Sequence, residues 1–140
     1  MARILIIDDS RTVHVALKHA FQKDGHDAVG LSNFADLAVT LERERPDVIV
    51  LDLLMPGFNG IQFARFIQRF AENPPPIILH SGSDRELARI AAREIRPFEI
   101  VPKGDSEAEL RGAVARALVA RRRVAPPPSP RPGLRPGSAR

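Results

Sequence analysis

The sequence predicts an α/β fold in which a parallel five-stranded sheet is covered by helices on both faces. Short runs of branched apolar residues, such as residues 4–7 and 48–51, recur along the 140-residue chain. Unbroken apolar runs of this length are typical of strands that are buried on both faces. Stretches with apolar residues at helical spacing separate the runs, and this regular alternation favours a parallel sheet with right-handed crossovers.

Each expected strand comes from a short apolar run that polar or turn-forming residues bound. The third run is the most distinctive, because Asp52 follows it directly and Pro56 and Gly57 turn the chain soon afterwards. An acid at the carboxyl end of a central parallel strand lies where open α/β sheets place their ligand sites. The expected strands are residues 4–7, 28–31, 48–51, 77–80 and 98–101.

Five helices are expected to follow these strands. The first ends near Gly25, and the second must stop before Pro46, because proline disfavours helical geometry in the preceding residue. The last three begin with capping pairs, which are Asn59 with Gln62, Ser83 with Glu86, and Ser106 with Glu109. The inward-facing residues at helical spacing are Val13, Leu17, Ala20 and Phe21; Leu37, Ala38 and Leu41; Phe63, Phe66, Ile67 and Phe70; Leu87, Ile90 and Ala91; and Leu110, Val114, Ala117 and Leu118.

Charge and composition divide the chain into a folded part and a tail. The formal net charge is +4, but residues 121–140 hold six arginines and no acid, which leaves 15 basic and 17 acidic residues in residues 1–120. From residue 125 onward, the sequence is rich in proline and arginine and has almost nothing apolar to bury. We therefore expect one domain over residues 1–123 and a disordered, Pro/Arg-rich tail over residues 124–140.

The composition also excludes several kinds of site. The chain contains no cysteine, so disulfides, thiol chemistry and zinc–thiolate sites are excluded. The apolar run near the start is too short for a signal peptide, and no stretch approaches the roughly 18 apolar residues of a membrane span. A cytoplasmic location is the default expectation. The tail has no aromatic residues for base stacking, so we expect no specific nucleic-acid binding.

Polar residues stand at the ends of four expected strands. Asp8 and Asp9 follow the first, Asp52 the third, Ser81 the fourth and Lys103 the fifth. In a parallel sheet, these ends meet at one edge, so three carboxylates, a hydroxyl and an ammonium should converge. Three close acids repel one another unless a cation lies among them, and carboxylates without cysteine or clustered histidine favour Mg²⁺. Such a site is suited to phosphoryl transfer onto a carboxylate, which depends on positioning and charge neutralisation.

The same residues resemble a known family, the receiver domains of bacterial two-component response regulators. The resemblance covers residues 3 to about 120 and includes the acid pair, the segment from Asp52 to Pro56 with Gly60, and Ser81 and Lys103 in register. It implies the flavodoxin-like (βα)5 fold, a doubly wound sheet with strand order 2-1-3-4-5. It also implies a stand-alone receiver that signals by binding other proteins.

The resemblance implies a role for each residue of the site. Asp52 would accept a phosphoryl group from a sensor histidine kinase, while Ser81 and Lys103 would bind the phosphoryl oxygens. The protein would be a signalling receiver rather than an enzyme, although it would assist its own phosphorylation and dephosphorylation. The implied Mg²⁺ ligands are Asp8 through water, Asp9, Asp52 and the backbone carbonyl of Leu54.

Two positions depart from the family pattern. Receiver domains usually have proline after the lysine, whereas Gly104 follows Lys103 here and Pro102 precedes it. Ile100 stands three residues before the lysine, where the family has its switch aromatic, and Phe98 lies two residues earlier on the same strand face. These departures favour an unusual readout and motivate an alternative function, a pseudo-receiver that binds partners without phosphorylation.

A third possibility, an Asp-nucleophile phosphohydrolase, fits the sequence less well. That class needs an acid two positions after its nucleophile at the end of its first strand, but Asp8 and Asp9 are adjacent and Ser10 follows.

A histidine, His80, directly precedes Ser81. Strand alternation points it away from that serine, so we expect it to be a packing or surface residue.

The resemblance also suggests where partners bind. In the family, the fourth helix, the fifth strand and the fifth helix form the output face, and the expected fourth helix carries a basic stripe of Arg85, Arg89 and Arg93. The stripe is either a docking site for an acidic partner or a solvated face. The resemblance leaves room for a dimer that forms on phosphorylation.

Overall fold

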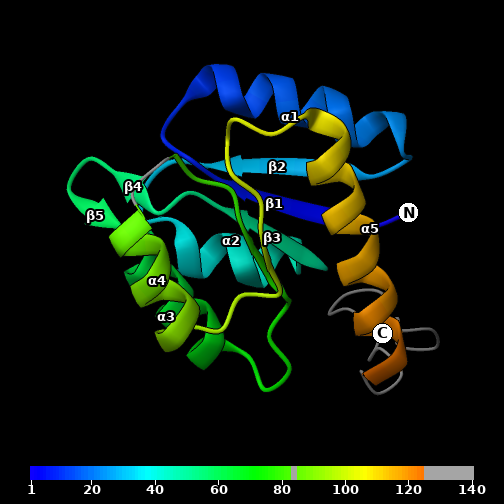
Figure 1. The fold of residues 1–140 in the computed structure, drawn as a ribbon. Coiled ribbons are helices and arrows are strands. Elements are labelled where there is room, and N and C mark those ends of the chain that lie inside the picture. Colours follow the sequence, from blue (N-terminus) through cyan, green and yellow to red (C-terminus); the bar gives the residue numbers. More distant parts are fainter. Residues whose placement is uncertain (83–84, 125–140) are drawn as a thin grey trace.

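A computed structural model describes residues 1–82 and 85–124 and shows one parallel five-stranded sheet (Figure 1). Its strands are β1 (Arg3–Ile7), β2 (Asp27–Leu31), β3 (Val48–Leu51), β6 (Ile77–Leu79) and β7 (Glu99–Ile100). They lie in the order β2-β1-β3-β6-β7, and every neighbouring pair is parallel. The α/β class and the predicted strand order 2-1-3-4-5 are therefore confirmed.

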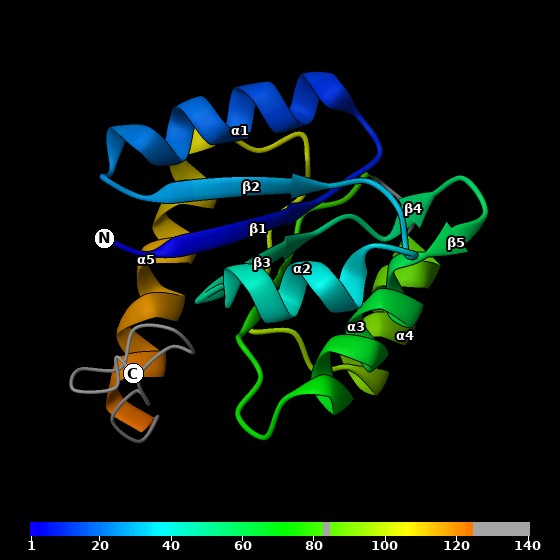
Figure 2. The same cartoon turned by 180° about the vertical axis from the view of Figure 1, so that it is seen from behind.

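Helices cover both faces of this sheet, as Figures 1 and 2 show from opposite sides. The helices are α1 (Arg11–Lys23), α2 (Leu37–Glu44), α3 (Gly60–Phe70), α4 (Arg85–Glu94) and α5 (Glu107–Val124). Helices α1 and α5 pack on one face with Ile4 and Ile6, whereas α2, α3 and α4 pack on the other with Leu5 and Ile7. Alternate residues of β1 thus enter two separate apolar clusters, which explains the unbroken apolar run.

The ends of the helices follow local chemistry that the sequence indicates. The Ser10 hydroxyl accepts from the Val13 amide at the start of α1, and Asn59 Oδ1 accepts from the amides of Ile61 and Gln62 at the start of α3. The Ser106 hydroxyl accepts from the Glu109 amide. The predicted cap at Ser83 lies outside the described residues.

A small hairpin separates β3 from α3 and was not predicted. Strands β4 (Leu54–Met55) and β5 (Phe58–Asn59) pair antiparallel with each other around a turn in which Gly57 has φ +82°, apart from the main sheet. Gly60 then brings the chain back, because its amide donates to the Leu53 carbonyl at 2.7 Å. A Cβ at Gly60 would lie 2.4 Å from the Asp52 carbonyl oxygen, so this approach requires glycine.

The structure tests the predicted last strand but not the predicted tail. The predicted strand over residues 98–101 is shorter, because β7 pairs with β6 only through Glu99 and Ile100. Helix α5 extends to Val124. The predicted tail lies, apart from that residue, outside the described part of the chain, so its disorder stays a prediction. None of the helices in the described segments is long and apolar enough to span a membrane.

Candidate functional site

The predicted site residues converge at the carboxyl edge of the sheet. Asp8 directly follows β1, Asp52 directly follows β3, and Ser81 and Lys103 lie shortly after β6 and β7. Hydrogen bonds between the loops hold this edge together, because the Asp52 amide donates to the Ile7 carbonyl at 2.9 Å and the Lys103 amide donates to the Ser81 carbonyl at 2.8 Å. The parallel order therefore brings together residues up to 95 positions apart in the sequence.

Asp52 lies at the centre of the site, with only 4% of its surface exposed. Its Oδ1 accepts from the Ser81 hydroxyl at 2.9 Å and from the Leu54 amide at 3.2 Å. Its Oδ2 lies 3.2 Å from Lys103 Nζ. The Ser81 hydroxyl in turn accepts from the Leu53 amide at 3.3 Å, which fixes its direction. A buried carboxylate is thus held by a hydroxyl, an amide and a cation.

Lys103 carries the positive charge that compensates the acids. Its Nζ bridges Asp52 and Asp8, with 2.8 Å to Asp8 Oδ2. Desolvation of the half-buried ammonium is the largest single influence and lowers its pKa, but the hydrogen bond to Asp8 and the charges of Asp52 and Asp8 outweigh it, so the pKa of Lys103 is raised. The lysine is therefore fully charged at neutral pH.

Three carboxylates of this site lie close enough to bind one metal ion. Ligand oxygens of Asp8, Asp9 and Asp52 lie within 4.8 Å of one another; Asp8 and Asp52 are buried and Asp9 is exposed. The Ser10 amide donates to Asp8 Oδ1 at 2.9 Å and orients that side chain. Leu54 begins β4 close to Asp52, and the role of its carbonyl stays a prediction. Carboxylate oxygens alone, with one side open to solvent, suit a hard divalent cation.

His80 is a neighbour of the site whose contact the sequence did not reveal. The residue is half-buried, and its Nδ1 lies 2.9 Å from the Val101 carbonyl oxygen at the exit of β7. Alternation along β6 predicts the direction of the ring but not its partner, because the partner depends on the register between β6 and β7. The expectation of a simple packing or surface residue is incomplete here.

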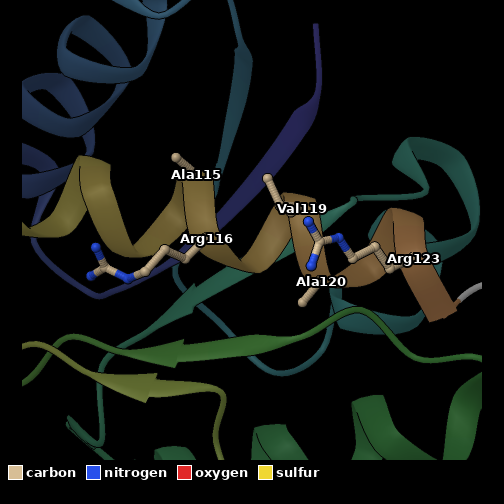
Figure 3. A pocket seen from close by; sticks show the side chains of 5 residues that line it. All are labelled: Ala115, Arg116, Val119, Ala120 and Arg123. Atoms are coloured by element: carbon tan, nitrogen blue, oxygen red, sulfur yellow. The ribbon is translucent and has the colours of Figure 1, made fainter.

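Apolar residues are exposed around β7, and arginines are exposed on α5. Phe98 is 40% and Ile100 42% exposed, while the intervening Glu99 pairs with Arg116 of α5 at 2.7 Å. On α5, a hollow of about 510 Å³ contains Val119 between arginine side chains, and Figure 3 shows Arg116 and Arg123 flanking it. None of the residues that line this hollow belongs to the acidic site.

Comparison with known proteins identifies the family. The sequence model of the response regulator receiver domain matches residues 4–115. Protein PilH of Pseudomonas aeruginosa is 37% identical over 91 residues, which cover 64% of this chain and 75% of PilH. The alkaline phosphatase synthesis transcriptional regulatory protein PhoP of Bacillus subtilis is 26% identical over 127 residues, or 91% of this chain, but the chain spans only about half (52%) of PhoP.

Solved structures agree on the fold. The signal receiver domain of a response regulator from Bermanella marisrubri has a TM-score of 0.77 and 24% identity, covering 83% of this chain and 97% of that one. At this identity, the likeness concerns the fold alone. The family match, the identity to PilH and the acidic site at the carboxyl edge of the sheet lead to one conclusion: the chain belongs to the response regulator receiver domain family.

Proposed function

We propose that this protein receives a phosphoryl group from a sensor histidine kinase on Asp52, with Mg²⁺, and signals by binding a partner protein. The observation that carries the proposal is the environment of Asp52, in which Ser81 Oγ and Lys103 Nζ contact opposite carboxylate oxygens at 2.9 and 3.2 Å. These two groups already lie where oxygens of a phosphoryl group on Asp52 would need a hydrogen-bond donor and a cation.

The transfer step needs little chemistry from the protein. A carboxylate oxygen of Asp52 attacks the phosphorus of a phosphohistidine, the P–N bond breaks, and its electron pair stays on the imidazole nitrogen, which then takes a proton from solvent. No residue of this chain has to gain or lose a proton. The site contributes position and charge, which is how phosphoryl transfer is mainly catalysed.

Mg²⁺ fits the donor set at this edge. Asp8, Asp9 and Asp52 supply only carboxylate oxygens, and Asp9 is exposed, so the cluster is accessible from solvent. Magnesium typically binds through one or two carboxylates, several waters and phosphate oxygens. When bound, it would neutralise charge that develops on the transferred group. Asp8 and Asp52 also need such compensation, since Lys103 is the one cation that pairs with these acids in the described part of the chain.

The protein would act as a signalling receiver rather than as an enzyme with a separate substrate. Its own residues would promote both the gain and the hydrolytic loss of the phosphoryl group, and the product would be a changed surface. We place that surface on α4, β7 and α5, where Phe98 and Ile100 are exposed and Arg85, Arg89 and Arg93 line α4. An acidic downstream protein suits this face, or a second copy of the chain on phosphorylation. Such signalling takes place in the cytoplasm.

Intact-protein mass spectrometry after incubation with acetyl phosphate tests the proposal. With Mg²⁺ we expect one added phosphoryl mass, which should be absent without Mg²⁺ and absent in Asp52→Asn. Asp47→Asn is a matched control, because Asp47 accepts from the Arg3 amide at 2.8 Å at the opposite end of β3. This variant should take up the phosphoryl group like the wild type.

The alternative, a pseudo-receiver that binds its partner without phosphorylation, rests on Ile100. This residue replaces the aromatic side chain of the family and is 42% exposed, so it presents an apolar surface before any modification. The same experiment separates the two functions. A wild-type protein that gains no phosphoryl mass and does not bind beryllofluoride, a mimic of the acyl phosphate, would favour the pseudo-receiver and overturn our proposal.

A further inference from the structure

The loop that carries Lys103 is held by few hydrogen bonds. The Val101 amide donates to the Leu79 carbonyl at 2.8 Å, and the Lys103 amide donates to the Ser81 carbonyl at 2.8 Å. Between them, Pro102 has no amide hydrogen to donate, but its carbonyl accepts from the Asp105 amide at 3.0 Å, which closes a turn across Lys103 and Gly104. After Lys103, Gly104 is exposed, and a Cβ built on it would meet nothing within 4 Å. This turn begins at Pro102, so the place of the turn and of its lysine depends in part on the bonds made at the preceding residue, Val101.

His80 supplies a further hydrogen bond to Val101. Its ring Nδ1 lies 2.9 Å from the Val101 carbonyl oxygen, while its own amide donates to the Leu51 carbonyl at 2.9 Å. A carbonyl oxygen only accepts, so Nδ1 must carry the hydrogen. The ring thus connects the residue that directly follows β6 to Val101, two residues before the lysine.

We propose that His80 is a positioning residue: by donating from Nδ1 to the Val101 carbonyl, it holds the loop that places Lys103 Nζ between Asp8 and Asp52. The proposal rests on the proposed function only for its kinetic test, because the position of Lys103 is a property of the unphosphorylated chain. His80 acts through the backbone, because its ring nitrogen contacts the Val101 carbonyl.

The need to place Lys103 accurately explains why a side chain would hold the Val101 carbonyl. Phosphoryl transfer requires Nζ to be within a few tenths of an ångström of its place, and Lys103 has a long side chain with many rotamers. Its backbone must therefore be fixed on both sides. The bond from the Asp105 amide to the Pro102 carbonyl closes the chain after the lysine, and we assign the anchor before the lysine to the Val101 carbonyl and the His80 ring.

The first test is the protonation state of the ring in the full-length wild-type protein. Nitrogen-15 NMR of the histidine side chains should show hydrogen on Nδ1 of His80, which is the less common tautomer of neutral histidine in water. A hydrogen on Nε2 with a bare Nδ1 would overturn the proposal, because that ring cannot donate to Val101. This measurement needs no phosphorylation.

The second test compares variants that keep or lose the donor. His80→Asn retains an N–H group near the place of Nδ1, whereas His80→Leu removes it. We expect acetyl phosphate to modify His80→Leu roughly three- to tenfold more slowly than the wild type, as the loss of one hydrogen bond implies, and His80→Asn within about twofold of the wild type. Thermal unfolding of each variant checks that it is folded at the assay temperature.

His26→Leu is the matched control. It removes another histidine hydrogen bond, from the Ala2 amide to Nδ1 at 3.2 Å, at the opposite end of the sheet. Its phosphorylation rate should equal that of the wild type. Equal rates for His80→Leu and the wild type, or equal slowing in His80→Leu and His80→Asn, would overturn the proposal, since the donor would then be irrelevant.

A wild-type protein that takes no phosphoryl group would sink the proposed function but leave this inference testable. The side-chain ¹⁵N signal of the Lys103 ammonium should then be protected from exchange with water in the wild type and in His80→Asn, and lost in His80→Leu. An ammonium that is equally protected in all three proteins would show that His80 does not position Lys103.

Discussion

Strands β3 and β7 differ in how firmly the rest of the fold holds them. Strand β3 lies at the centre of the sheet between β1 and β6, its four residues are buried, and Asp52 directly follows it. Strand β7 lies at the edge, pairs through two residues and exposes Ile100. Asp52 is therefore held by the core of the sheet, whereas Ile100, on the surface that we propose for partner binding, is held by a short edge strand.

The largest effect should come from the central strand. Ile49 is fully buried, so Ile49→Ala should lower the free energy of unfolding by about 2–5 kcal/mol, through lost burial and the remaining cavity. Ile100→Ala removes a similar side chain from the edge strand and should cost less than about 1 kcal/mol. Urea unfolding of the two variants measures both. Comparable losses would show that β7 is as firmly packed as β3.

A smaller effect is expected from a substitution at Gly60, which lies against the backbone of Asp52. Gly60→Ala would place a Cβ 2.4 Å from the Asp52 carbonyl oxygen, and the backbone must shift to relieve the clash. We expect a loss of about 1–3 kcal/mol in the free energy of unfolding and slower modification of Asp52 by acetyl phosphate. Chemical denaturation and the mass-shift assay measure the two effects.

Gly104→Ala is the matched control on the lysine loop. Nothing lies within 4 Å of its added Cβ, so its stability should stay within about 0.5 kcal/mol of the wild type. If Gly104→Ala were as damaging as Gly60→Ala, close approach to Asp52 would not be the reason for glycine at position 60.

Sequence reasoning located the acidic site because two simple rules apply there. Apolar runs marked the strands around residues 4–7 and 48–51, and parallel order brought their polar ends together. The β4–β5 hairpin was missed because Pro56 and Gly57 indicate a turn but not the short pairing of Leu54 with Asn59. The bond from His80 to Val101 was missed because it depends on strand register, which no local pattern specifies.

The amino end of the sheet provides a pH-dependent comparison with the acidic end. His26 accepts from the Ala2 amide, and burial lowers the pKa of His26 below its usual 6.5, against the raising effect of Asp24. The unfolded chain therefore binds a proton more readily than the folded one as the pH falls below about 6.5. The stabilisation should be complete above that pH and decline as the pH falls through the lowered value.

Unfolding of the wild type and of His26→Asn between pH 8 and pH 5, at about 25 °C, checks this prediction. The difference in the free energy of unfolding between the two proteins should shrink at the acidic end of that range. A difference that is constant with pH would mean that His26 titrates alike in the folded and unfolded chains.

The smallest effect is expected at Arg96, which lies between α4 and the edge strand β7. Arg96 has φ +47°, a left-handed conformation in which side chains with a Cβ are strained. Arg96→Gly should therefore raise the free energy of unfolding, by about 0.5–1 kcal/mol, because the relief of strain exceeds the entropy that glycine adds to the unfolded chain. Gly25, with φ +80°, supplies the mirror experiment, since Gly25→Ala should lower stability by a similar amount. If Arg96→Gly instead lowered the free energy of unfolding, the contacts of the arginine side chain would stabilise the fold by more than its backbone strain destabilises it. The chain before β7 would then be held more firmly than the two-residue pairing of β7 suggests.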